Sequence, residues 1–314
     1  MQNMGRRYSN IDAIKCIAAF LVVTVHSHFP GLFGEIFLPI SYLGVPLFLM
    51  VSGYFFKPDK ALMWVKKVFL MAVICSLLYL LTWTPYFIAP ITIKSVARFI
   101  VLGTPLVCEP LWYLWALIPA LPIMRILVKK VSLNRLLLIG AVLFFIGVLI
   151  SMTPKPGDYH RNFLFTSLPY LILGYYIRNG KRIAISNYIL TGAAIIAGMP
   201  LMGGQIKIYM ILCSIVTPLF LYRCFYWITH SANIRVNVIS KIGERYSMLI
   251  YLVHPYILYR MQIWSDARGF VEEYRHWIEA PLCFAITLVI VMVCKTAYEK
   301  AFGVYKLNRS LKNA

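Results

Sequence analysis

The sequence predicts an all-α protein, a polytopic membrane bundle of about ten transmembrane helices with both termini in the cytoplasm. Three observations predict this class. The 314-residue chain is 61% hydrophobic, only 13% of its residues are charged, and its mean hydropathy is +0.75. Soluble domains carry about 25% charged residues. We therefore treat residues 1–314 as a single integral-membrane domain.

Apolar segments long enough to cross a bilayer recur along the whole chain. A hydrocarbon core about 30 Å thick requires about 20 residues of helix. The expected spans are 11–30, 37–56, 66–85, 110–128, 134–152, 162–178, 184–203, 206–227, 246–264 and 279–297. Segment 90–104 is too short and too polar to cross, so we expect it to lie at the membrane interface or to dip in and back.

The formal net charge of +20 could indicate a nucleic-acid partner, but the distribution of the charges argues against one. When the N-terminus is placed inside and the spans alternate, most lysines and arginines fall on the cytoplasmic side. This is the positive-inside pattern of a multi-spanning protein. The basic surface is expected to attract inner-leaflet lipids and no nucleic acid.

The first span contains two ionisable residues, Lys15 and His26, which lie eleven residues apart. Eleven residues at about 100° each bring a helix back to within roughly 20° of the same face, and the separation along the axis is roughly 16 Å. An ionisable group near the membrane centre costs on the order of 2.5–3.5 kcal/mol. The shared face therefore predicts a polar site inside the bundle.

His26 is the leading candidate for chemistry. An imidazole with an ordinary pKa of about 6.5 exchanges protons near neutrality, and a dehydrated pocket favours the neutral form that a general base needs. A hydrogen-bonded structural histidine is the alternative. Asp12 precedes Lys15 by three residues, so the two side chains can pair on one helix face. Alternatively, Asp12 only favours a helix N-terminus and Lys15 extends to the interface.

Further polar groups fall in or beside later spans. The small Ser52–Gly53 step is expected to let a neighbouring helix approach closely. Glu109 stands at the outer end of a span and is followed by Trp112 and Tyr113. Aromatic residues at this depth commonly form an interfacial belt, although a nearby carboxylate could bind a sugar hydroxyl.

A second histidine, His254, is expected near mid-membrane, directly before Pro255. The proline loosens the local helix hydrogen bonding, which is tolerated where the freed groups face protein or a cavity. Two intramembrane histidines make a polar cavity more plausible than one does. Several charged residues also crowd the segment 265–278, which we expect to be an outer loop that is solvated or contacts a polar substrate.

Taken together, five short motifs resemble the membrane acyltransferase-3 family, the multi-spanning O-acyltransferases that modify bacterial surface glycans. The motifs are Lys15-x10-His26, Asn10-Ile11-Asp12, Phe48 to Gly53, Trp112-Tyr113-Leu114 and Tyr251 to Pro255. Each motif is short, but their order is fairly specific and the likeness covers nearly the whole chain. Pro110 stands where many members have a histidine.

The resemblance implies transfer of an acetyl group from cytoplasmic acyl-CoA to a hydroxyl of an extracytoplasmic glycan or lipid-linked sugar, in the bacterial inner membrane. No bound cofactor is expected, and no metal site either, because the cysteines form no C-x-x-C pair. The catalytic candidates are His26 (as base or transient acyl carrier), Lys15 and Asp12. The acceptor-binding candidates are Ser52, Glu109, Trp112, Tyr113 and His254. Lys66 and Lys67 replace the arginine pair of many members as the candidates for CoA binding.

Two other classes of function fit the same residues. Intramembrane Lys, His and Asp side chains are equally natural in a proton-coupled transporter or flippase of a sugar-like substrate. A ligand-sensing membrane module without turnover is the third possibility.

Overall fold

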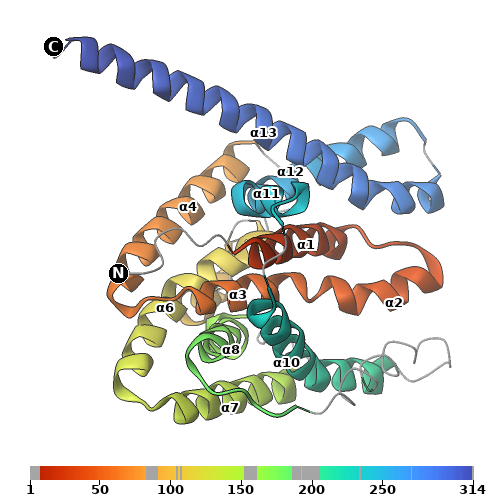
Figure 1. Cartoon of the computed structure of the whole chain (residues 1–314). Coiled ribbons are helices and arrows are strands. Elements are labelled where there is room, and N and C mark those ends of the chain that lie inside the picture. The colour runs from red at the N-terminus through yellow and green to blue at the C-terminus, as the bar shows by residue number, and fades with distance from the viewer. Residues whose placement is uncertain are drawn as a thin grey trace.

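The computed structural model is built from helices in the order that the apolar segments predict (Figure 1). It describes residues 8–82, 91–103, 105–106, 108–151, 161–185, 192, 206–232, 235–269 and 271–312. Within these ranges the regular structure is helical, and no strand occurs. The all-α class is therefore confirmed for the described part of the chain.

The main helices are α1 (Ser9–His26), α2 (Gly31–Ser41), α3 (Gly44–Tyr54), α4 (Ala61–Leu81), α5 (Ile93–Leu102), α6 (Trp112–Lys130), α7 (Leu133–Ser151), α8 (Leu168–Asn179), α10 (Ile206–His230), α11 (Val238–Arg245), α12 (Ser247–Ala267) and α13 (Glu272–Lys312). Three short helical turns lie between them in the described ranges. These are η1 (Pro58–Lys60), η3 (Glu109–Leu111) and the π-helical η4 (Phe163–Ser167).

Among the residues that the structure describes, six segments are long and apolar enough to cross a membrane. They are Ser9–His26, Gly31–Tyr54, Pro58–Leu81, Glu109–Lys130, Leu133–Ser151 and Tyr274–Ala301. Each matches a predicted span, so the chain is a multi-pass membrane protein. The predicted spans 162–178, 206–227 and 246–264 also fall on helices but are not among these six, and 184–203 lies largely outside the described residues. The total of about ten and the cytoplasmic termini remain predictions.

Helix α1 occupies the centre of the bundle. It packs against α3, α11, α12 and α13, and Figure 1 shows α1 between α3 and α11. The small residues Ala18 and Ala19 are fully buried, as is Val23. Small side chains let several helices approach one axis closely. The polar residues of α1 are consequently surrounded by α3, which follows closely in the sequence, and by α11, α12 and α13 from the C-terminal part of the chain.

Helices α3 and α8 approach each other at two glycines. A Cβ atom on Gly53 would lie 2.0 Å from the carbonyl oxygen of Leu171, and one on Gly174 would lie 2.0 Å from that of Met50. Any larger residue would push the two backbones apart. The close approach expected at the Ser52–Gly53 step is confirmed.

Two connecting regions differ in outcome. Segment 90–104 contains α5, which spans about 15 Å at 1.5 Å per residue and is too short to cross a bilayer. Its Ile93 and Ile100 are exposed, and its position at the membrane interface stays a prediction. The loop expected at 265–278 is wrong in extent, because α12 continues to Ala267 and α13 already begins at Glu272.

Candidate functional site

The first part of the site lies near the start of α1. Lys15 Nζ is 2.8 Å from Asp12 Oδ1, so the predicted pairing is confirmed. Asp12 is buried and Lys15 is half-buried. Helix α11 packs directly on this turn, since a Cβ on Gly243 would lie 1.7 Å from the Asp12 carbonyl oxygen. The ion pair is thus partly shielded from solvent by a helix that the sequence places far away.

His26 is the last residue of α1. Its side chain is exposed. Its ring centroid lies 5.5 Å from that of His254 on α12, with the two planes tilted by 35°. The structure therefore brings together the two histidines that the sequence identified separately.

His254 differs from His26 because its side chain is fully buried. Its Nδ1 lies 2.8 Å from the carbonyl oxygen of Tyr251 and 3.1 Å from that of Ile250. A carbonyl only accepts hydrogen bonds, so Nδ1 carries the proton and the neutral ring keeps its lone pair on Nε2. Nε2 is buried and has no hydrogen-bond partner among the residues described.

An aromatic cluster connects the histidines to α3 and α6. The hydroxyls of Ser52 and Tyr113 are 3.2 Å apart. The rings of Tyr113 and Tyr251 meet edge to face at 5.4 Å, and the Tyr251 ring is 6.1 Å from that of His254. The Tyr251 hydroxyl donates a hydrogen bond to the carbonyl of Pro110. Ser52, Tyr113 and His254, three of the predicted acceptor-binding residues, therefore belong to one contact network.

The other two predicted acceptor-binding residues lie at the edge of this network. Trp112 begins α6 and is half-buried. Glu109 is exposed, and its carboxylate is 3.6 Å from the guanidinium of Arg161. Arg161 also lies over the ring of Tyr42 and within electrostatic range of His26. The sequence analysis did not select Arg161, because nothing local relates it to the first span.

Lys66 and Lys67, the predicted CoA-binding residues, are exposed on α4. The same helix reaches the histidine region through Tyr79, whose hydroxyl donates to the carbonyl of Leu252 at 2.8 Å. The distance along α4 from Lys66 to Tyr79 is roughly 20 Å at 1.5 Å per residue. The lysines are consequently far from the imidazoles, and a ligand that contacts both must be long.

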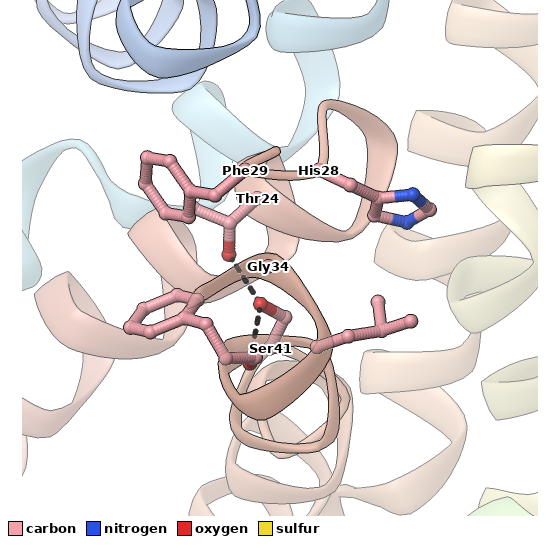
Figure 2. Close-up of a pocket in the computed structure, with 7 residues that line it drawn as sticks. Thr24, His28, Phe29, Gly34 and Ser41 are labelled. Atoms are coloured by element: carbon pink, nitrogen blue, oxygen red, sulfur yellow. Dashed lines mark hydrogen bonds between the residues drawn. The ribbon is translucent and has the colours of Figure 1, made fainter. Parts of the chain in front are cut away.

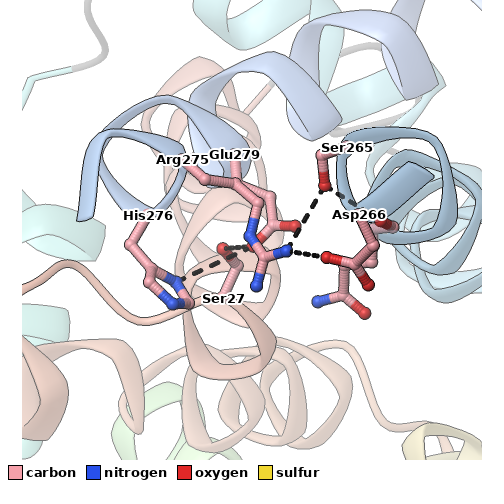
Figure 3. A network of polar contacts seen from close by, with 7 residues as sticks. Ser27, Ser265, Asp266, Arg275, His276 and Glu279 are labelled. Atoms are coloured by element: carbon pink, nitrogen blue, oxygen red, sulfur yellow. Dashed lines mark hydrogen bonds and ion pairs between the residues drawn. The ribbon is translucent and has the colours of Figure 1, made fainter. Parts of the chain in front are cut away.

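A buried carboxylate that the sequence analysis did not select lies beside His26. The hydroxyl of Ser27 donates a 2.7 Å hydrogen bond to Glu279 Oε2, and both residues are buried. His276 Nδ1 is 4.0 Å from the same oxygen. Figure 3 shows this group together with Arg275, which pairs with Asp266 of α12. The missed signal was an acidic residue at the edge of the apolar span 279–297, where a charge is costly.

Two other features do not add to the site. The hollow between α1 and α2 in Figure 2 has no room for a water molecule, and its Thr24 and Ser41 hydroxyls lie 2.8 Å apart. It is a packing contact beside the exposed His28. No group of three or more His, Cys, Asp or Glu residues placed to hold a metal ion occurs in the described part of the chain.

The fold defines a helical multi-pass membrane protein in which the imidazoles of two helices lie against each other. A family model described as "Acyltransferase domain" matches residues 8–296, and the chain belongs to this acyltransferase-3 family. The predicted family is thereby confirmed over nearly the whole chain. Its membership supports acyl transfer as the class of activity.

One curated relative is similar over part of the chain. It is an "Amino-acid racemase" from Enterococcus faecalis, 30% identical over 213 residues, which are 58% of this chain and 30% of that protein. The match thus spans less than a third of the relative's length. No solved structure matches the chain.

Proposed function

We propose that the protein is an O-acyltransferase of the bacterial inner membrane that moves an acetyl group from cytoplasmic acetyl-CoA to a hydroxyl of an extracytoplasmic glycan or lipid-linked sugar. The observation that carries this proposal is the imidazole pair. The exposed His26 lies against the fully buried His254, whose Nε2 has no partner in the described structure. Family membership supplies the reaction class.

The reaction needs little more than a base and correct positioning, because a thioester is already activated. His26 removes the proton from the acceptor hydroxyl, and the oxygen attacks the thioester carbonyl. The tetrahedral intermediate then expels the CoA thiolate, which takes the proton from the His26 imidazolium. A positioned base contributes about 10²–10⁴-fold, and holding both substrates together contributes up to about 7–11 kcal/mol.

The remaining residues divide between the two substrates. Lys66 and Lys67 bind CoA phosphates as point charges, and Lys15 with Asp12 lines the path of the donor. Ser52, Tyr113, Trp112 and Glu109 bind the acceptor, and His254, predicted as a further acceptor-binding residue, acts through its contact with His26. Support for this division comes from the contacts among Ser52, Tyr113 and His254, and from the long separation between Lys66 and the imidazoles along α4.

A second candidate function is transport of a small polar substrate. It is favoured by the ionisable side chains on the membrane-spanning helices, because the Asp12–Lys15 ion pair and the two imidazoles are equally natural in a proton-coupled carrier. A transporter would accumulate its substrate in vesicles without acyl-CoA. An acyltransferase would release free thiol from acetyl-CoA only when an acceptor is present.

The test uses purified protein in lipid vesicles with acetyl-CoA and a glycan extract. Free thiol is measured together with the mass of the acceptor, and we expect each thiol released to match one acetyl group gained. The His26→Ala variant should lose about 10²–10⁴-fold in rate. His28→Ala, which removes a nearby exposed imidazole, is the matched control. Full transfer by His26→Ala would overturn the proposed role of His26.

A further inference from the structure

The sequence step His254–Pro255 has a consequence for helix hydrogen bonding. In an α-helix the N–H of residue i donates to the carbonyl of residue i−4, and proline has no N–H. Pro255 therefore leaves the carbonyl of Tyr251 without its helical donor. Helix α12 nevertheless continues without interruption from Ser247 to Ala267, so the carbonyl must be satisfied in another way.

The side chain of His254 supplies the missing donor. Its Nδ1 is 2.8 Å from the Tyr251 carbonyl oxygen, which is the shorter of its two contacts. Inside a protein an unpaired carbonyl costs free energy comparable to a lost hydrogen bond. This carbonyl therefore selects the tautomer with the proton on Nδ1 and the lone pair on Nε2.

The hydrogen bond from His254 Nδ1 to the Tyr251 carbonyl is the main interaction that orients the His254 ring. The groups that face it are the ring of His26 from α1, the ring of Tyr251 from its own helix, and the thiol of Cys283 from α13, which lies 3.6 Å from the His254 carbonyl. No carboxylate contacts the ring among the interactions of the described residues. In many enzymes a carboxylate or carbonyl holds one nitrogen of a histidine so that the other can act.

We propose that Pro255 is a positioning residue that holds His254 in the Nδ1–H tautomer, so that His254 Nε2 accepts a hydrogen bond from His26 during acyl transfer. The catalytic consequence rests on the proposed function, whereas the tautomer does not. When His26 takes the hydroxyl proton it carries two N–H groups. One donates to His254 Nε2, and the other proton passes to the departing thiolate. His254 keeps its own proton throughout.

The experiment compares the wild type with Pro255→Ala, using protein labelled with ¹⁵N-histidine. Alanine restores a backbone N–H for the Tyr251 carbonyl and is a strong helix former, so the variant should fold. The ¹⁵N signature of His254, assigned with a His254→Asn variant, should show Nδ1–H alone in the wild type and a mixture of tautomers in Pro255→Ala. The kcat for acetyl transfer should fall about tenfold, with KM for acetyl-CoA within about twofold.

Pro218→Ala is the matched control, because Pro218 also lies inside a helix, α10, but follows no histidine. It should leave both the His254 tautomer and kcat unchanged. An Nε2–H tautomer in the wild type, or an unchanged tautomer and kcat in Pro255→Ala, would overturn the proposal. If the wild type transfers no acyl group, the proposed function fails, whereas the ¹⁵N spectra still decide the tautomer.

Discussion

The hydroxyl of Ser27 and the carboxylate of Glu279 form a 2.7 Å hydrogen bond between two buried side chains. Ser27 directly follows His26 at the point where α1 ends, and Glu279 lies in the second turn of α13. A buried carboxylate is costly unless it is hydrogen-bonded. The bond therefore fixes the end of the helix that carries His26 to a helix from the other end of the sequence.

Removing the Ser27 hydroxyl should destabilise the bundle. Ser27→Ala leaves Glu279 Oε2 without its closest donor, and we expect a loss of about 1–3 kcal/mol. Thermal unfolding in detergent would measure it. Ser231→Ala, which removes a solvent-exposed hydrogen bond from the residue just after α10 to the carbonyl of Trp227, should change stability by less than about 0.5 kcal/mol. Equal melting of both variants would show that the Ser27–Glu279 bond contributes nothing.

The contact between α3 and α8 should tolerate no side chain at its glycines. Gly53→Ala places a Cβ 2.0 Å from the backbone of Leu171, so we expect a loss of at least about 3 kcal/mol or failure to fold. Gly303→Ala has no atom within 4 Å of the new Cβ and should be neutral or slightly stabilising. Yield of monodisperse protein and its melting temperature would distinguish the two.

The Tyr251 hydroxyl should hold the start of α6 in place. Tyr251→Phe removes the hydrogen bond to the Pro110 carbonyl and should cost about 1 kcal/mol, up to about 3 if that carbonyl stays unpaired. Because Pro110 lies between Glu109 and Trp112, we also expect KM for the acceptor to rise. Tyr274→Phe, an exposed position, provides the comparison. An unchanged melting temperature and KM in Tyr251→Phe would contradict this expectation.

The two lysines of α4 should act on the donor alone. Replacing both Lys66 and Lys67 by alanine is expected to raise KM for acetyl-CoA about tenfold, equivalent to 1.4 kcal/mol, with little change in kcat. Added salt should weaken CoA binding by the wild type more than by this variant, because exposed charges are screened. Lys300→Ala, another exposed lysine, should leave KM unchanged. A fall in kcat without a change in KM would exclude the predicted role.

The sequence predicts those features that depend on local periodicity. Asp12 and Lys15 pair as their spacing requires, and the small Gly53 marks a real close approach. The same reasoning cannot show that His26 meets His254, because helix packing between distant segments decides that contact. It also missed Ser27 and Glu279, since each residue taken singly has an ordinary position at the edge of an apolar segment.

The expected outer loop at 265–278 failed for a physical reason. Its charges suggested a solvated connection, but Arg275 pairs with Asp266 and joins the ends of α12 and α13. Apart from the left-handed Gly269 and its neighbours, charged residues there continue the two helices. Charge alone does not end a helix when partners on the adjacent helix are within reach.

Helix α13 supports both ends of α1, directly at Ser27 and through α11 near Asp12. Glu279 holds the end at Ser27, while Lys295 donates a hydrogen bond to the last carbonyl of α11, the helix that packs on Asp12. The single helix α13 thus helps to fix the distance between the turn that contains Lys15 and the imidazoles. A molecule that contacts both Lys15 and the imidazoles has to span roughly 16 Å along the helix axis. The bundle does not shorten this distance, so the length of the ligand decides whether it can bind at both places.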